Sequence, residues 1–126
     1  MNVSVFEAIA DLLIPAGADM PSASQAAVGT IGLAEVLNFR PELRPTIDSI
    51  LAHCEGKSPQ EALNSLDAGS RAAFAEMVAS AYFMNEEVRA KLNYHGQQAK
   101  PIVPEHIDAA LLQSVLERGR IYREAK

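Results

Sequence analysis

The sequence predicts an all-α fold, a compact bundle of about five to seven short-to-medium helices joined by loops that contain proline and glycine. Apolar residues recur at helical spacing in most segments, and no segment alternates with period two for long enough to form a strand. Alanine is abundant and tryptophan is absent, a composition that favours close-packed helices. Because each expected helix has one apolar face, neighbouring helices have to cover it.

The first helix is expected to begin at Ser4, whose hydroxyl forms a capping box with the carboxylate of Glu7. Pro15 ends this helix, because the residue before a proline is pushed out of helical geometry. A rigid loop over residues 15–23 follows. The apolar face of the helix consists of Phe6, Ile9, Ala10 and Leu13.

A second helix is predicted from Ser22 or Ser24 to near Phe39. Gly29 and Gly32 lie inside it, and each weakens a helix by about 1 kcal/mol relative to alanine. Glycines in such positions also let another backbone approach closely. The pair is therefore interpreted as a helix-packing feature.

A third helix is predicted with Pro41 in its first turn, where the missing amide hydrogen costs little. Gly56 ends it. The apolar stripe of this helix consists of Leu43, Ile47, Ile50, Leu51 and Cys54.

A fourth helix, from Pro59 to about Leu66, is opened by a second capping box between Ser58 and Glu61. Asp67 is expected to cap a fifth helix. That helix ends near Met84 and carries an apolar face of Phe74, Met77, Val78 and Ala81.

A short sixth helix is predicted to start at Asn85, with Glu86 and Glu87 at its positive end. Glu87 and Lys91 form an i,i+4 pair worth a few tenths of a kcal/mol. Gly96 is the expected C-cap of this helix.

A polar, proline-containing connector over residues 97–104 leads to a last helix from Glu105 to near the C-terminus. There are no repeats, low-complexity tracts or linkers between domains, so residues 1–126 are predicted to form a single domain. A chain of this length buries roughly two-thirds of its unfolded surface, enough for a core without metal or disulfide.

Charge and hydropathy exclude several function classes. The formal net charge is −5 and no Lys/Arg cluster occurs, which argues against nucleic acid and anionic membrane surfaces. No apolar run is long enough for direct membrane insertion. The N-terminus shows no signal peptide or twin arginine, so the sequence as written predicts a cytoplasmic protein. Removal of a leader, or export with a partner, would make it periplasmic.

The residues that could act in catalysis or metal binding are better explained as parts of the helical structure. Cys54 and His53 are neighbours on a helix, where side chains diverge by about 100°, and Cys54 lies on the apolar stripe, which predicts a buried thiol. None of His53, His95 and His106 follows a glutamate by three residues, as a helical di-iron site requires, and cysteine pairs are absent. The sequence therefore predicts no catalytic residue, no cofactor-binding residue and no metal ligand in this chain.

Two short segments are similar to the motifs of a known family. The first runs from Ile14-Pro15 through Met20-Pro21 and Ala23 to Val28-Gly29, and the second from Tyr82 through Val88 to Leu92-Asn93-Tyr94-His95-Gly96. Together they resemble the gluconate 2-dehydrogenase subunit 3 family, and the likeness extends from about Phe6 to His106 in the same order. Many relatives carry Tyr-Pro-Gly where this chain has Tyr94-His95-Gly96.

The resemblance implies a non-catalytic small subunit. Such a subunit binds and stabilises a large FAD-dependent dehydrogenase subunit of the glucose-methanol-choline type, which oxidises a sugar, glycoside or polyol. FAD is then expected in the large flavoprotein subunit and not in this chain, and a cytochrome subunit often accepts the electrons. Relatives with a twin-arginine leader also assist the maturation or export of their partner.

The same resemblance places the partner-binding surface at the two motif segments, whose prolines limit backbone freedom and so reduce the entropy lost on docking. The expected docking residues are Pro15, Met20, Pro21, Tyr82, Tyr94, His95 and Gly96. The segment 94–98 has two interpretations: a packed turn with Tyr94 as a hydrophobic plug, or an exposed patch for a partner or a sugar. The alternative functions are a stand-alone helical ligand-binding or homo-oligomeric interaction protein, and an independent small enzyme.

Overall fold

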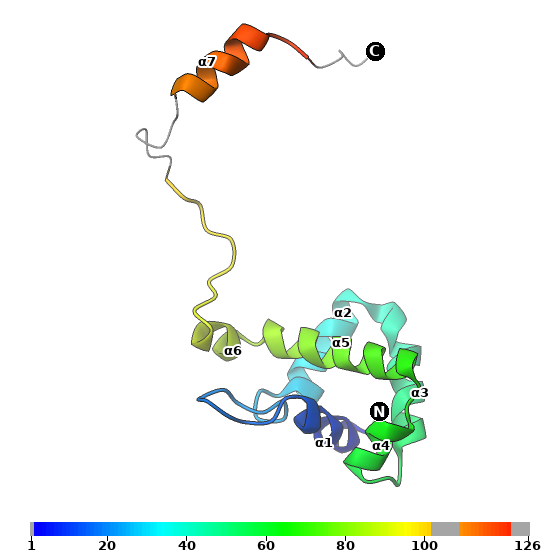
Figure 1. Ribbon diagram of the computed structural model, residues 1–126. Coiled ribbons are helices and arrows are strands. Elements are labelled where there is room, and N and C mark those ends of the chain that lie inside the picture. The colour runs from blue at the N-terminus through cyan, green and yellow to red at the C-terminus, as the bar shows by residue number, and fades with distance from the viewer. Residues whose placement is uncertain (1, 102–108, 122–126) are drawn as a thin grey trace. The chain divides into compact units, whose positions relative to one another are not determined.

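The computed structural model describes residues 2–101 and 109–121, and it is all-α, as the sequence predicts (Figure 1). Residues 17 and 20 form an isolated β-bridge, and no strand occurs in the described ranges. The chain divides into two units, residues 1–95 and 96–126. A single domain over 1–126 stays a prediction. The helices are α1 (Val3–Leu13), η1 (Val28–Gly32), α2 (Leu33–Phe39), η2 (Pro41–Leu43), α3 (Arg44–Cys54), α4 (Pro59–Ser65), α5 (Ala68–Met84), α6 (Glu86–Lys91) and α7 (Ala109–Arg118).

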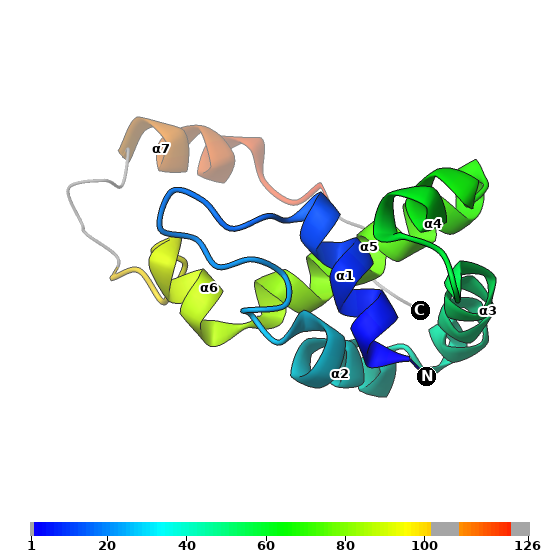
Figure 2. The same ribbon diagram turned by 90° about the horizontal axis from the view of Figure 1, so that it is seen from below.

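The core of the first unit lies between α1, α2, α3 and α5, and α5 is the longest helix of this bundle (Figure 2). The rings of Phe6 and Phe74 meet at its centre, with centroids 5.0 Å apart and tilted by 54°. Their packing joins α1 to α5. Other fully buried side chains of this core include Ile9, Val28, Leu33, Ile47, Cys54, Met77, Val78 and Val88.

Three predicted helix starts are confirmed by their hydrogen bonds. At α4 the Ser58 amide donates to Glu61 Oε2 at 3.1 Å, and the Glu61 amide donates to Ser58 Oγ at 3.4 Å, which completes the capping box. Asp67 accepts from the Ser70 amide at α5. At α6 the Asn85 side chain is the N-cap and accepts from the Val88 amide.

The start of α1 differs from the prediction. Asn2 is its N-cap and accepts from the Val5 amide, while the Ser4 hydroxyl donates to Asn2 Oδ1 at 2.8 Å. Asparagine is as strong an N-cap as serine, so the cap lies two residues before the predicted one at Ser4, and the helix begins at Val3. Leu13, expected on the buried face, is 37% exposed.

The second helix begins later than predicted. Residues 22–27 form turns, and Ala27 has a φ of 54°, a left-handed conformation that interrupts a right-handed helix. The Val28 amide bonds to the Ala23 carbonyl at 3.0 Å, and the chain then enters the π-helical turn η1 and α2. The helical start at Ser22 or Ser24 is therefore wrong.

The predicted role of the two glycines is confirmed. A Cβ on Gly32 would lie 2.9 Å from Ala81 Cβ and 3.0 Å from the Ala81 carbonyl oxygen. A Cβ on Gly29 would lie 2.4 Å from Glu7 Cγ. Glycine here allows η1 to approach α5 and α1 closely.

The third predicted helix is split. Pro41 lies in the 3₁₀ turn η2, and α3 begins at Arg44 with Pro45 in its first turn. Gly56 follows α3 with a φ of 73°. The predicted stripe is confirmed, because Ile47, Ile50, Leu51 and Cys54 are buried and Leu43 packs partly against the core.

The second unit contains α7 among its described residues. The predicted helix start at Glu105 lies outside the described residues. Leu112, Val115 and Leu116 of α7 are exposed. None of the described helices is both long and apolar enough to cross a membrane.

Substituting Gly32 with alanine should destabilise the chain by about 1 kcal/mol or more, because the overpacking against α5 exceeds the gain in helix propensity. Urea unfolding monitored by circular dichroism measures this. Gly17→Ala is the matched control, since a Cβ at Gly17 meets no atom within 4 Å. A Gly32→Ala variant as stable as the native chain would contradict the packing described.

Candidate functional site

The segment between α1 and η1 is closed at its base by polar contacts. Asp11 of α1 accepts from the Ser24 amide at 2.8 Å and from the Ser24 hydroxyl at 2.6 Å. The Ala23 amide also donates to the Ile14 carbonyl at 3.0 Å. These contacts fix both ends of a loop, residues 14–24, that is called the motif loop below.

The tip of the motif loop is a two-residue turn. Gly17 and Met20 exchange two backbone hydrogen bonds, of 3.2 and 2.9 Å. The two residues between them, Ala18 and Asp19, have φ values of 48° and 65°. Positive φ at both central positions is typical of a type I′ turn, and alanine adopts it at a cost of roughly 1–2 kcal/mol.

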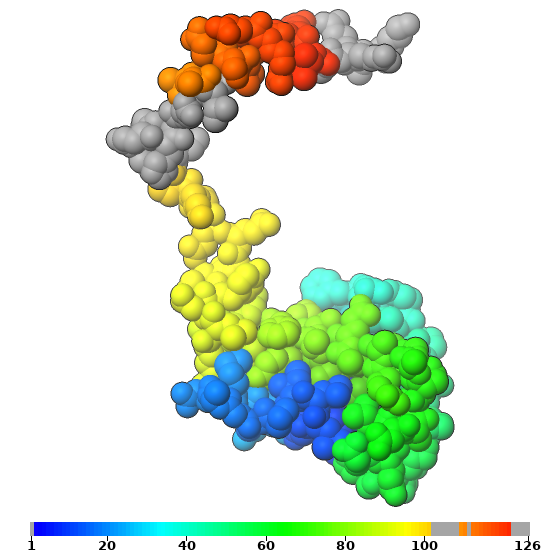
Figure 3. Space-filling view, in the orientation of Figure 1, coloured from blue at the N-terminus to red at the C-terminus, as the bar shows by residue number. Residues whose placement is uncertain are grey.

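Side chains from α5 and α6 donate hydrogen bonds to this part of the backbone. The Tyr82 hydroxyl donates to the Pro21 carbonyl at 2.7 Å, and Lys91 Nζ donates to the Asp19 carbonyl at 2.9 Å. Asn85 Nδ2 donates to the Ala26 carbonyl, just beyond the loop, at 3.1 Å. Figure 3 shows the blue surface of the motif loop beside the yellow-green surface of α6. The structure thus brings together two segments that lie far apart in the sequence.

The predicted C-cap at Gly96 is wrong, since α6 ends at Lys91. Asn93 takes the left-handed conformation with a φ of 54°. Its amide donates to the Ala90 carbonyl at 3.0 Å, and the Tyr94 amide donates to the Arg89 carbonyl at 2.9 Å. This pair of bonds is the Schellman motif, in which asparagine can replace glycine because its short polar side chain tolerates this conformation.

The seven expected docking residues fall into two groups. Tyr82 is 4% exposed and Met20 and Pro21 are half-buried, so these three shape the motif loop from within. Pro15, Tyr94, His95 and Gly96 are exposed, and Gly96 belongs to the second unit. Tyr94 is 59% exposed, which favours the exposed-patch interpretation of its segment over the plug.

A hollow of about 480 Å³ lies at the end of α6, lined by Phe83, Arg89, Leu92 and Tyr94. Phe83 packs edge-on against the Tyr82 ring, with centroids 5.6 Å apart. Sequence reasoning did not select Phe83 or Arg89 as functional residues. The sequence marks neither residue clearly. Phe83 lies next to the apolar stripe of α5, and Arg89 resembles the basic residues that are common in the last turn of a helix.

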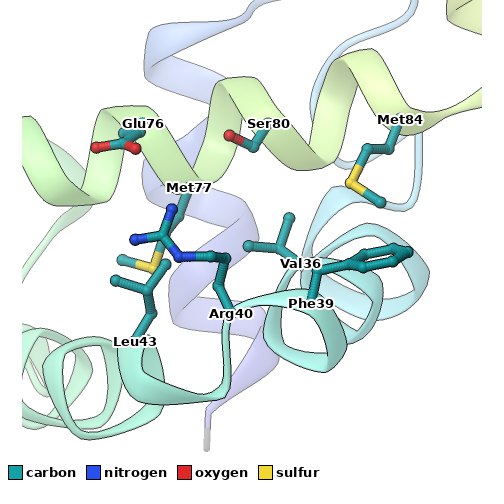
Figure 4. A pocket seen from close by; sticks show the side chains of 8 residues that line it. All are labelled: Val36, Phe39, Arg40, Leu43, Glu76, Met77, Ser80 and Met84. Atoms are coloured by element: carbon teal, nitrogen blue, oxygen red, sulfur yellow. The ribbon is translucent and has the colours of Figure 1, made fainter. Parts of the chain in front are cut away.

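A second hollow, of about 100 Å³, lies between α2, η2 and α5 and is lined by Val36, Phe39, Arg40, Leu43, Glu76, Met77, Ser80 and Met84. Figure 4 shows Phe39 near Met84 at one end and the Arg40 guanidinium beside Met77 at the other. Arg40 forms an ion pair with Glu42, and its hydrogen bond lowers the pKa of the Glu42 carboxyl. The volume is below the range of about 300–1,000 Å³ typical of small-molecule pockets.

The cysteine and the two described histidines lie in surroundings that do not suggest a catalytic role. Cys54 is fully buried, and burial raises the pKa of its thiol, as expected of an inert thiol. Nε2 of His53 lies 3.1 Å from Ser65 Oγ, and Nε2 of His95 lies 2.9 Å from Asn93 Oδ1. His106 lies outside the described residues. Within residues 2–101 and 109–121, no three His, Cys, Asp or Glu side chains gather as metal ligands would.

Comparison with protein-family models, curated proteins and solved structures gave no match to this chain. The likeness to the gluconate 2-dehydrogenase subunit 3 family therefore rests on the residues of the two motifs.

Asp11→Ala should destabilise the chain by about 1–2 kcal/mol at neutral pH, because Ser24 loses two hydrogen bonds to a carboxylate. Burial opposes ionisation of Asp11, but the bonds from Ser24 outweigh it and lower the pKa of this carboxyl. Because the pKa of Asp11 is lower in the folded state, its carboxylate stabilises the folded chain at pH values above its unfolded pKa of about 3.9. This stabilisation disappears as the pH falls through the folded pKa.

Urea unfolding of the native chain and of Asp11→Ala between pH 7 and pH 2 measures this difference. Asp48→Ala is the control, since Asp48 is exposed and makes no comparable contact. A difference that persists unchanged at the lowest pH would contradict the assignment.

Tyr82→Phe removes the hydroxyl that donates to the Pro21 carbonyl, and it should lower the free energy of unfolding by about 1 kcal/mol. The cost should be local, with faster hydrogen exchange at the amides of Gly17, Met20 and Ala23. Tyr94→Phe, which changes an exposed hydroxyl, should leave these amides unaffected. Equal exchange in the native chain and Tyr82→Phe would show that the loop does not depend on this bond.

Proposed function

We propose that this chain is a non-catalytic accessory subunit that binds and stabilises a large FAD-dependent dehydrogenase subunit acting on a sugar, glycoside or polyol. The motif resemblance supplies the class of partner. The geometry of the first unit supports a docking role, because the motif loop and the end of α6 lie side by side with exposed aromatic residues next to them.

Backbone strain is the observation that carries this proposal furthest. The non-glycine residues with positive φ in the described ranges are Ala18, Asp19, Ala27 and Asn93. Three lie in or next to the motif loop and the fourth ends α6. The conformation is strained at Ala18 and Ala27, because alanine does not favour it, whereas Asp19 and Asn93 have short polar side chains that tolerate it. Strained conformations persist where the surroundings fix them, and they cluster at binding sites.

The hydrogen bonds around the motif loop would also favour docking. Its backbone is held by Tyr82, Lys91 and Asp11, so little conformational entropy remains to be lost on binding. A subunit that binds only the folded flavoprotein stabilises it by mass action. This function needs an interface and no catalytic group, and substrate oxidation would belong to the FAD of the large subunit. An accompanying cytochrome subunit would take the electrons.

The alternative is a stand-alone helical ligand-binding or homo-oligomeric interaction protein. The hollow lined by Phe83, Arg89, Leu92 and Tyr94 is the observation that favours it, since an apolar concavity can also take a small ligand or a second copy. Affinity purification of the tagged chain from its host separates the two. The accessory role predicts a stoichiometric large partner with the visible absorption of a flavin, whereas a colourless monomer or homo-oligomer would contradict it.

Within that complex, the double variant Tyr94→Ala, His95→Ala should weaken binding by about tenfold or more, because tyrosine is enriched among the few interface residues whose truncation costs more than about 1 kcal/mol. Surface plasmon resonance with the purified large subunit measures the affinity. Phe39→Ala is the matched control, because Phe39 is also an exposed aromatic residue and lines the second hollow. Loss of affinity in the control with none in the double variant would place the interface elsewhere.

A further inference from the structure

The hollow at the end of α6 combines apolar side chains with one cation. Phe83, Leu92 and Tyr94 line it and are each about half exposed, with values of 53%, 49% and 59%. Arg89 is the charged member of the lining. This site, defined by the four residues, is called the Arg89 hollow below.

The Arg89 side chain lacks a polar partner. Its Nε is buried and donates no hydrogen bond to any of the described residues. A buried donor without an acceptor is unfavourable, and more so when it belongs to a charged group. Glu87 on the same helix pairs instead with Lys91 at 4.0 Å. Arg89 lines the hollow and forms no ion pair within the described residues, so its terminal nitrogens are suited to an acceptor from outside the first unit.

The backbone fixes the two ends of this hollow relative to one another. The Schellman motif bonds the Tyr94 amide to the Arg89 carbonyl, so one turn sets the position of both residues. Phe83 is held from α5 through its contact with the Tyr82 ring, and Tyr82 is itself bonded to Pro21. The hollow is preformed, which lowers the cost of binding.

We propose that the Arg89 hollow binds a segment of a partner protein in which a carboxylate stands beside an apolar side chain. The apolar group packs against Phe83, Leu92 and Tyr94, and the carboxylate accepts from the two terminal nitrogens of the Arg89 guanidinium. Guanidinium binds carboxylate through two parallel hydrogen bonds, and aromatic residues with arginine dominate the energetic centres of protein interfaces. The identity of that partner as a flavoprotein subunit rests on the proposed function; the chemistry of the segment does not.

The test uses the full chain labelled with ¹⁵N and two small probes. N-acetyl-phenylalanine carries a ring beside a carboxylate, and N-acetyl-phenylalanine amide carries the same ring without the charge. The acid should shift the Nε–H resonance of Arg89 and the amide resonances of Leu92 and Tyr94. It should bind at least about tenfold more tightly than the amide, the ratio expected for charge-assisted hydrogen bonding.

Arg89→Gln should abolish the preference for the acid and retain the weak response to the ring, while Arg44→Gln, an exposed arginine on α3, should behave as the native chain. Equal binding of the two probes, or no shift at Arg89 Nε–H, would overturn the proposal. So would shifts of these resonances on dilution of the chain alone, which would show a second copy in the hollow. The probes act on the isolated chain, so this test can succeed even if affinity purification finds no flavoprotein.

Discussion

The hydrogen bond from the Tyr82 hydroxyl to the Pro21 carbonyl is the contact on which the candidate site depends. Tyr82 is a core residue of α5, and its hydroxyl is the polar end of an otherwise buried ring. Through this bond the core fixes the position of a loop whose other contacts are those at its base and the bond from Lys91 to its tip. The same ring also positions Phe83 at the edge of the Arg89 hollow.

The loop and the end of α6 support one another. Lys91 bonds to the tip of the motif loop, and Asn85 both caps α6 and bonds to the Ala26 carbonyl. A single asparagine thus starts one helix and holds the turn that precedes η1. The left-handed conformations at Ala18 and Ala27 are stabilised by these surroundings, because alanine alone does not favour them. A rigid surface with exposed aromatic groups is the result.

Local signals in the sequence were sufficient for most of the fold. Capping residues such as Ser58 and Asp67 act within four residues, and apolar stripes repeat along one helix, so both can be read without the tertiary structure. Gly29 and Gly32 indicated close packing, although not which helices would approach them. The turns over 22–27 could not be predicted, because long-range bonds between Ser24 and Asp11 and between Asn85 and Ala26 hold them, whereas local propensity favours helix there.

The candidate site was predictable in part. The motif residues indicated the loop and the end of α6. They did not show which residues are buried and which are exposed: Tyr82 faces the core, and Tyr94 faces solvent. Arg89 could not be selected from the sequence, because only the folded structure shows that its buried Nε has no hydrogen-bond partner among the described residues. Asn93 gave a usable signal, because asparagine is the usual substitute for glycine after a helix.

The central claim is that the motif loop is ordered before any partner binds. The backbone ¹⁵N order parameters of residues 14–24 in the isolated chain test it directly. An ordered loop should give values close to about 0.85, the level of rigid backbone. Values below about 0.6 across the loop would show a flexible segment and would contradict a preformed docking surface.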